Sequence, residues 1–357
     1  MLTAEEFELE FLDPGEVKKR LLAEYEEAGT TQVFPKRELP AIRKRCQQEP
    51  FYFLLTCFPH RFGNPENQQA RRYVFCDAHY DLWKYTQILH KLVVMCGFRG
   101  LGKSTIANFG RMMYDICLRT TDYIVMGSYN ERMVRKLIFP IMLELETNPR
   151  VKQLYGDLTG TRVWNSQNIL TANGVKLEGL GIGQTIRGAL TQDGARPAVL
   201  VLDDIISNEA AHSQVQKDSL LRWIFSDLLP SMRPEGWSAR LLATMICAQS
   251  AIFELCYDEQ YKDKIELLLI NIRDKHGKPT WEHRFPERVI QRYEKTIPAY
   301  AFKGEYMMPP EPDEGTLFIR KEHVHYYTED ELRGKILFTM AFNDPAARTG
   351  KSNDYTA

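Results

Sequence analysis

Residues 97–104 read G-F-R-G-L-G-K-S and satisfy the pattern G-x-x-x-x-G-K-[ST] at every fixed position. The apolar run at residues 92–96 predicts a buried strand before this loop, and apolar residues recur after it at helical spacing, at Ile106, Phe109, Met113 and Ile116. Strand, glycine loop and helix form the context in which the pattern cradles phosphate on backbone N–H groups. The alternative is a glycine-rich turn that matches the pattern by chance.

The loop predicts ATP and Mg²⁺ as cofactors. In this motif the lysine reaches the β- and γ-phosphates and the hydroxyl residue ligates Mg²⁺, which assigns these roles to Lys103 and Ser104. The residues expected to contact the nucleotide are Gly97, Arg99, Gly100, Gly102, Lys103, Ser104 and Thr105.

Composition narrows the class of protein. The 357 residues suggest about two domains, and 44% hydrophobic with 26% charged residues are ordinary values for a soluble globular chain. A net charge of −1 carries no global signal for nucleic acid, so any DNA contact must come from local basic clusters such as residues 43–45, 71–72 and 132–136. The seven cysteines form no C-x-x-C pair, and no apolar run reaches 18 residues. We therefore expect a soluble intracellular protein that does not enter a membrane.

The order of apolar and polar segments predicts an α/β fold with a mostly parallel sheet covered by helices on both faces. We expect a helical segment at residues 1–60, a phosphate-loop ATPase domain at 61–300, a linker at 301–334 and a last segment at 335–357 that opens with a new strand. Within the second of these we expect helices at 77–91 and 130–146, a hairpin of 168–171 with 174–177, and strands at 92–96, 123–126, 198–202, 240–245 and 265–272.

Besides the glycine loop, a phosphate-loop site needs a second strand that ends in an acidic residue to hold the metal. Residues 198–204 supply it as an apolar run that ends in two aspartates. Asp203 would orient the Mg²⁺ shell, and the next acid would position and activate the attacking water. That acid is Asp204, although Glu209, five residues further on, competes for the role of base. The alternative is a strand followed by an aspartate that caps the next helix.

Two further predicted roles follow from position. Thr244, at the end of the next apolar strand, could sense the γ-phosphate, although threonine is also simply a common strand residue. A cation on the γ-phosphate can contribute up to ~10³–10⁵ in rate. Arg99 inside the loop could supply it within one subunit, whereas Arg187 in a glycine-bounded loop could reach a neighbouring subunit. A plain surface salt bridge is the alternative for either arginine.

Taken together, these residues resemble the large terminase subunit of tailed bacteriophages over most of the chain. The resemblance rests on His79 ahead of the phosphate loop, Arg99 within it, and the loop at residues 186–188 that precedes R-P-A-V-L-V-L-D-D-I at 196–205. It continues through Thr244 and G-T-L-F at 315–318. The resemblance implies a RecA-like ATPase domain with an additional strand.

The end of the chain resembles the opening hairpin of that family's RNase H-like nuclease, in F-T-M-A-F-N-D-P-A at 338–346 and S-N-D-Y-T-A at 352–357. The family's first metal-binding aspartate carries over to Asp344. Because a two-metal nuclease needs several converging carboxylates, one hairpin would leave the site incomplete. We expect no cleavage by this chain, and two divalent metals only in an intact nuclease domain.

The implied function is a viral DNA-packaging motor, which couples ATP hydrolysis to translocation of double-stranded DNA into a procapsid. The implied partners are the portal protein, a small terminase subunit and further copies in a ring on the portal, within the host cell cytoplasm. Asp204 departs from the glutamate common in the family, so the base stays open. The alternatives are a helicase or DNA-repair ATPase, a small-molecule kinase, and a portal-docking module that binds nucleotide without hydrolysing it.

Overall fold

A seven-stranded sheet organises the computed structural model, which describes residues 14–62, 75–186, 191, 194–206, 214–245 and 250–308. The strands are β1 Leu92–Gly97, β2 Tyr123–Ser128, β3 Asn168–Leu170, β4 Lys176–Gly181, β5 Val199–Asp203, β6 Ser238–Ala243 and β7 Ile265–Ile270. The helices of the described residues are α2 Pro14–Glu27, α3 Leu39–Gln48, α4 Pro50–Cys57, α5 Pro59–Phe62, α6 Asp77–Tyr85, the π-helix η1 Ser104–Gly110, α7 Arg111–Cys117, α8 Glu131–Thr147, α9 Pro149–Tyr155, α10 Gln214–Arg222, the π-helix η3 Trp223–Leu228, the 3₁₀-helix η4 Leu229–Ser231, α11 Ala251–Tyr257, α12 Glu287–Thr296 and α13 Ala299–Tyr306. None of these helices has the length and apolar character needed to cross a membrane.

The strand order is β3-β4-β2-β5-β6-β1-β7, and every pairing is parallel except that of β3 with β4. The predicted α/β class with a mostly parallel sheet is therefore confirmed. The strand β6 lies between β1, which leads into the glycine loop, and β5, which ends in the aspartates. This interposed strand is the additional strand that the family resemblance implied.

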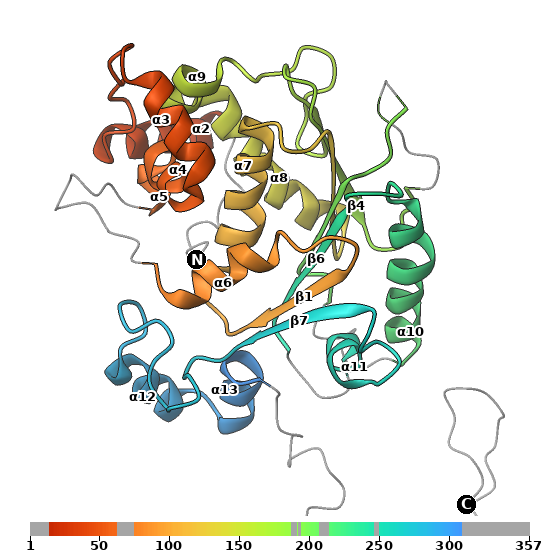
Figure 1. Cartoon of the computed structure of the whole chain (residues 1–357). Helices are drawn as coiled ribbons and strands as arrows, with labels where there is room; N and C mark the ends of the chain where they lie inside the picture. The colour runs from red at the N-terminus through yellow and green to blue at the C-terminus, as the bar shows by residue number, and fades with distance from the viewer. Residues whose placement is uncertain are drawn as a thin grey trace, which may run out of the picture.

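Alternating side chains of the strands feed two separate cores. On one face, β1 contributes Val93 and Met95 to a core shared with α6, α7 and α8; on the other, Leu92 and Val94 pack with α10 and α11. Figure 1 shows α6, α7 and α8 on one side of the sheet and α10 and α11 on the other. Both faces of the sheet are buried, which explains why the strands read as continuous apolar runs in the sequence.

Several predicted boundaries differ from the structure; the strand expected at 240–245, for example, is β6 Ser238–Ala243. The helix expected at 77–91 ends at Tyr85, because the Thr86 hydroxyl donates to the Trp83 carbonyl and His90 adopts φ +61°, which no helix accommodates. The hairpin turn is longer than expected, with Gly174 at φ +88° and its N–H bonded to the Thr171 carbonyl over 2.9 Å. The division into four segments stays a prediction.

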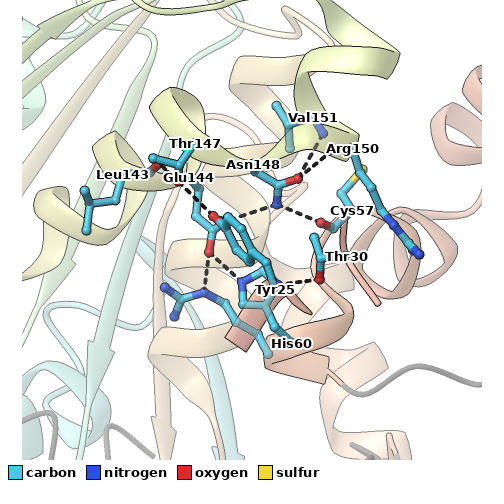
Figure 2. Close-up of polar contacts among 11 residues, drawn as sticks. Tyr25, Thr30, Cys57, His60, Leu143, Glu144, Thr147, Asn148, Arg150 and Val151 are labelled. Atoms are coloured by element: carbon cyan, nitrogen blue, oxygen red, sulfur yellow. Dashed lines mark hydrogen bonds and ion pairs between the residues drawn. The ribbon is translucent and has the colours of Figure 1, made fainter. Parts of the chain in front are cut away.

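A buried carboxylate joins the N-terminal helices to the rest of the fold (Figure 2). Glu144 of α8 accepts hydrogen bonds from His60 Nε2 (2.7 Å) and Arg61 Nε (2.9 Å) through one oxygen. Its other oxygen accepts from the Tyr25 hydroxyl (2.8 Å) and Asn148 Nδ2 (2.9 Å). The Glu144 side chain is fully buried. Segments up to 119 residues apart in sequence thus meet on one charge.

Burial opposes ionisation of Glu144, yet the charge and hydrogen bond of His60, with Arg61 and Asn148, lower its pKa to about 2. A carboxylate with a depressed folded-state pKa stabilises the fold above its unfolded pKa of about 4.3, and this stability is lost as the pH falls toward 2. The N-terminal helices are therefore held by an interaction that acid removes.

We predict that Glu144→Gln lowers the free energy of unfolding by about 3–5 kcal/mol at pH 7, because it leaves Arg61 and His60 without their buried counter-charge. The difference from the unsubstituted chain should shrink as the pH falls from about 5 toward 2. Urea unfolding at several pH values measures both effects. The control is Glu131→Gln on the exposed start of α8, expected to change stability by less than about 0.5 kcal/mol. Equal losses in the two variants would contradict the prediction.

Candidate functional site

The glycine loop follows β1 directly, as predicted, and its shape requires glycine. Gly100 and Gly102 adopt φ of +84° and +91°, a region that side chains disfavour. A Cβ on Gly97 would lie 2.7 Å from Leu101 Cδ2, and one on Gly100 would lie 2.9 Å from the Phe285 ring. The loop is therefore wound tightly against its own apolar residue and against the segment that precedes α12.

Lys103 connects the loop to the end of β6. Its Nζ donates to the carbonyls of Gly97 (2.6 Å) and Phe98 (3.3 Å) and to the Thr244 hydroxyl (3.1 Å). Burial lowers the pKa of Lys103, and the charges of Asp203 and Asp204 oppose that shift. The structure thus brings Lys103 and Thr244, 141 residues apart, into direct contact.

Asp203 ends β5 and is 2% exposed. Asn108 Nδ2 donates a hydrogen bond of 2.8 Å to it, and the Ser104 side chain lies close enough to lower its pKa by hydrogen bonding. Burial and the neighbouring charge of Asp204 raise the pKa of Asp203 well above its usual range, against the effect of those hydrogen bonds and of Lys103. Ser104 and Asp203, predicted as metal residues, therefore lie together.

These groups fit a magnesium ion that is held together with a nucleotide. A hydroxyl and a carboxylate are the hard oxygen donors that Mg²⁺ prefers, and a cation beside Asp203 would favour its charged form. Across the described ranges, no three His, Cys, Asp or Glu side chains form a cluster that could hold a metal alone.

Asp204 lies in an unusual backbone conformation at the same edge. Its φ is +49°, and its carbonyl accepts from the N–H of Tyr129 (3.2 Å) and from the Ser128 hydroxyl (3.4 Å). These bonds tie the end of β5 to the end of β2, while Asp204 itself is exposed. Strained backbone of this kind persists where neighbouring contacts enforce it, and it is common at functional sites.

Arg99 pairs with α13. Its N–H donates to the Glu305 carbonyl over 2.8 Å, and its guanidinium lies 3.3 Å from the Glu305 carboxylate. The Arg99 side chain is 67% exposed. Thr105 lies beside Ser104 in η1 and is half-buried. The remaining predicted site residues, Arg187, Glu209 and Asp344, lie outside the described residues, so their roles stay predictions.

His79 supports the loop from behind, a role that sequence reasoning did not assign. Its Nδ1 accepts from the Cys76 N–H (2.9 Å), and its Nε2 donates to the Leu101 carbonyl (2.9 Å), so the ring is neutral. The edge of the ring packs on Trp281 at 4.5 Å between centroids. Burial lowers the pKa of His79 to about 4. A lone histidine in a helix carries no signal of a loop 22 residues away.

Comparison with known proteins gives only likenesses of structure: no family model matches the chain, and no curated protein matches it in sequence. The large terminase ATPase domain of Thermus phage P74-26 is similar at 15% identity and a TM-score of 0.41, over 64% of this chain and 96% of that one. The large terminase of the thermophilic bacteriophage D6E, in complex with ADP, is similar at 10% identity and a TM-score of 0.39, over 65% of this chain and 53% of that one. This chain thus spans about half the length of that protein. The Phi-28 gp11 DNA packaging motor is similar at 12% identity and a TM-score of 0.31, over 53% of this chain and 58% of that one.

We predict that His79 makes the fold less stable in mild acid. The unfolded chain takes up a proton near pH 6.5 and the folded chain only near pH 4, so stability falls between these values by about 3 kcal/mol. The variant His79→Gln should show a pH dependence that is flatter by about this amount in urea unfolding. The control, His276→Gln in an exposed turn, should leave the curve unchanged. Parallel curves for His79→Gln and the unsubstituted chain would refute the prediction.

Proposed function

We propose that this chain is a DNA-packaging motor ATPase of the large terminase kind, which couples ATP hydrolysis to translocation of double-stranded DNA into a procapsid. The observation that carries the ATPase part is the meeting of three strand ends. Lys103 after β1 contacts Thr244 after β6, and Asp203 at the end of β5 accepts a hydrogen bond from Asn108 of the helix that begins at Ser104. The motor assignment is supported by the motifs through which the chain resembles terminases.

Each residue has a distinct proposed role. Lys103 binds the β- and γ-phosphates, in exchange for the carbonyls of Gly97 and Phe98 that it now contacts. Ser104 and Asp203 would hold Mg²⁺, which neutralises charge that develops on the phosphoryl oxygens. The loop N–H groups cradle the phosphates, since Gly100 and Gly102 allow the backbone to turn inward.

Hydrolysis also needs a group that orients water and a cation that meets the γ-phosphate. Asp204 is exposed at the carboxyl edge of the sheet and is held there by Ser128 and Tyr129, which supports it as the base; Glu209 is the competing candidate. Arg99 would have to leave Glu305 to act within its own subunit, whereas Arg187 would act on a neighbour. Thr244 reports the phosphate state to β6 through Lys103.

The proposed setting follows from the family resemblance. The motor would work as a ring on the portal protein, with a small terminase subunit delivering the DNA, in the host cell cytoplasm and transiently on the procapsid. Asp344 would be a metal ligand of a nuclease domain. ATP turnover separates this proposal from a portal-docking module that does not hydrolyse nucleotide, and a helicase stays the alternative.

We predict that Lys103→Ala lowers ATP turnover by about 10²-fold or more, because the cation that contacts the phosphates is lost. Double-stranded DNA should raise the turnover of the unsubstituted chain. Phosphate release, measured with and without DNA, tests both. The matched control is Lys91→Ala, at the opposite end of β1, where the lysine pairs with Glu266 on the surface. Turnover equal in Lys103→Ala and the control would exclude the proposed site, and nucleotide binding without turnover, even with DNA and portal present, would favour the docking module.

We further predict complementation between two inactive variants if Arg187 acts across subunits. A Lys103→Ala subunit keeps Arg187, and an Arg187→Ala subunit keeps an intact phosphate loop. Mixed rings on the portal should therefore recover part of the ATPase rate that neither variant shows alone. An assembled mixed ring without recovered activity would count against Arg187 as the trans-acting cation and favour Arg99.

A further inference from the structure

Asn108 lies on the inner side of η1, one turn beyond Ser104, and is 2% exposed. Its Nδ2 donates to Asp203 Oδ2 over 2.8 Å, and this bond is buried. Because a carboxylate offers only acceptors, the amide nitrogen must face Asp203, and the orientation of the Asn108 side chain follows.

The oxygen of the Asn108 amide is unusual for a buried polar atom. Asn108 Oδ1 is buried and has no hydrogen-bond partner among the described residues. Such an unpaired buried acceptor costs about 1–3 kcal/mol, and most buried polar atoms avoid it. A leucine of similar size would avoid the cost but would leave Asp203 without its donor. Asparagine at this position therefore lowers the stability of the fold but places a polar group beside the Asp203 carboxylate.

The helix that carries Asn108 is itself specialised. Residues 104–110 form a π-helix, in which the Arg111 N–H reaches the Ile106 carbonyl five residues back, and π-helical turns recur at functional sites. The fully buried Arg240 of β6 donates to the Ala107 carbonyl (3.3 Å) and to Asp115 of α7 (3.3 Å). These bonds fix the turn that bears Asn108 to the strand that ends near Thr244.

We propose that Asn108 is a positioning residue for Mg²⁺: it holds the Asp203 carboxylate in the orientation that receives the ion and presents Oδ1 as an acceptor for water in the ion's shell. This rests on the proposed function, since it deepens the role of the same nucleotide site. Groups that hydrogen-bond a ligating carboxylate set its orientation, and their loss typically costs 10–100-fold in metal affinity. Among the described residues the Asn108 side chain hydrogen-bonds to Asp203 and not to residues 97–103 of the loop, so we expect its effect to fall on the metal.

The test measures binding of an ADP labelled with a fluorophore on its ribose, in EDTA and across a Mg²⁺ titration. In Asn108→Leu we expect a dissociation constant in EDTA within about twofold of the unsubstituted chain, and a half-saturating Mg²⁺ concentration raised about tenfold or more. Asn108→Ser, which is too short to reach Asp203, should behave alike and guards against a folding defect in the leucine variant. The control is Met112→Leu, a buried apolar exchange on the following turn.

An unchanged Mg²⁺ requirement in folded Asn108→Leu or Asn108→Ser would overturn the proposal. Loss of ADP binding in EDTA to the same extent as in Mg²⁺, with a lower melting temperature in both variants, would also overturn it, because that pattern marks a purely structural residue. If the unsubstituted chain binds the labelled ADP in neither condition, the proposed function itself fails. The two failures are therefore distinguishable in one experiment.

Discussion

Parallel pairing of β6 between β1 and β5 is the constraint on which the site depends. Parallel strands end at the same edge of a sheet, so the residues after β1, β6 and β5 must lie side by side there. The Lys103–Thr244 bond is a direct consequence of this order. If β1 and β5 were neighbours, Thr244 would have no route to the loop. The strand order thus brings side chains from three segments that are distant in sequence together at one edge of the sheet.

The same edge of the sheet carries two ionisable groups, Lys103 and Asp203, that burial holds away from their charged forms. Lys103 and Asp203 both have pKa values displaced toward their neutral forms by burial, and each opposes the shift in the other. Such pairs are a poor source of stability, because desolvation offsets most of their attraction. Burial of ionisable groups at a glycine loop is instead typical of sites that bind a charged ligand. The free energy lost by desolvating these groups is offset by the apolar side chains buried in the two cores on either side of the sheet.

Much of this arrangement could be predicted from the sequence, because glycine spacing and apolar runs report local structure directly. The class of fold, the interposed strand expected from the family resemblance, and the proximity of Ser104, Asp203 and Thr244 to Lys103 all match the structure. Contacts between segments that share no pattern could not be predicted. No periodicity indicates that His79 supports Leu101, or that the Asn108 amide faces Asp203 across 95 residues. Helix 77–91 was predicted too long because the capping bond of Thr86 competes with helical hydrogen bonding.

The segment after α12 shows how backbone bonds place the next part of the chain beside the site. The Arg99 N–H donates to the Glu305 carbonyl, and the Ile272 N–H donates to the Tyr306 carbonyl. The end of α13 therefore packs against both the loop and the residues that follow β7. Met308 is then fastened by a pair of hydrogen bonds with the Asn271 side chain. Backbone groups cannot leave such bonds without a loss comparable to any buried hydrogen bond. A change in the shape of the loop at Arg99 would therefore either break its bond to Glu305 or displace α13.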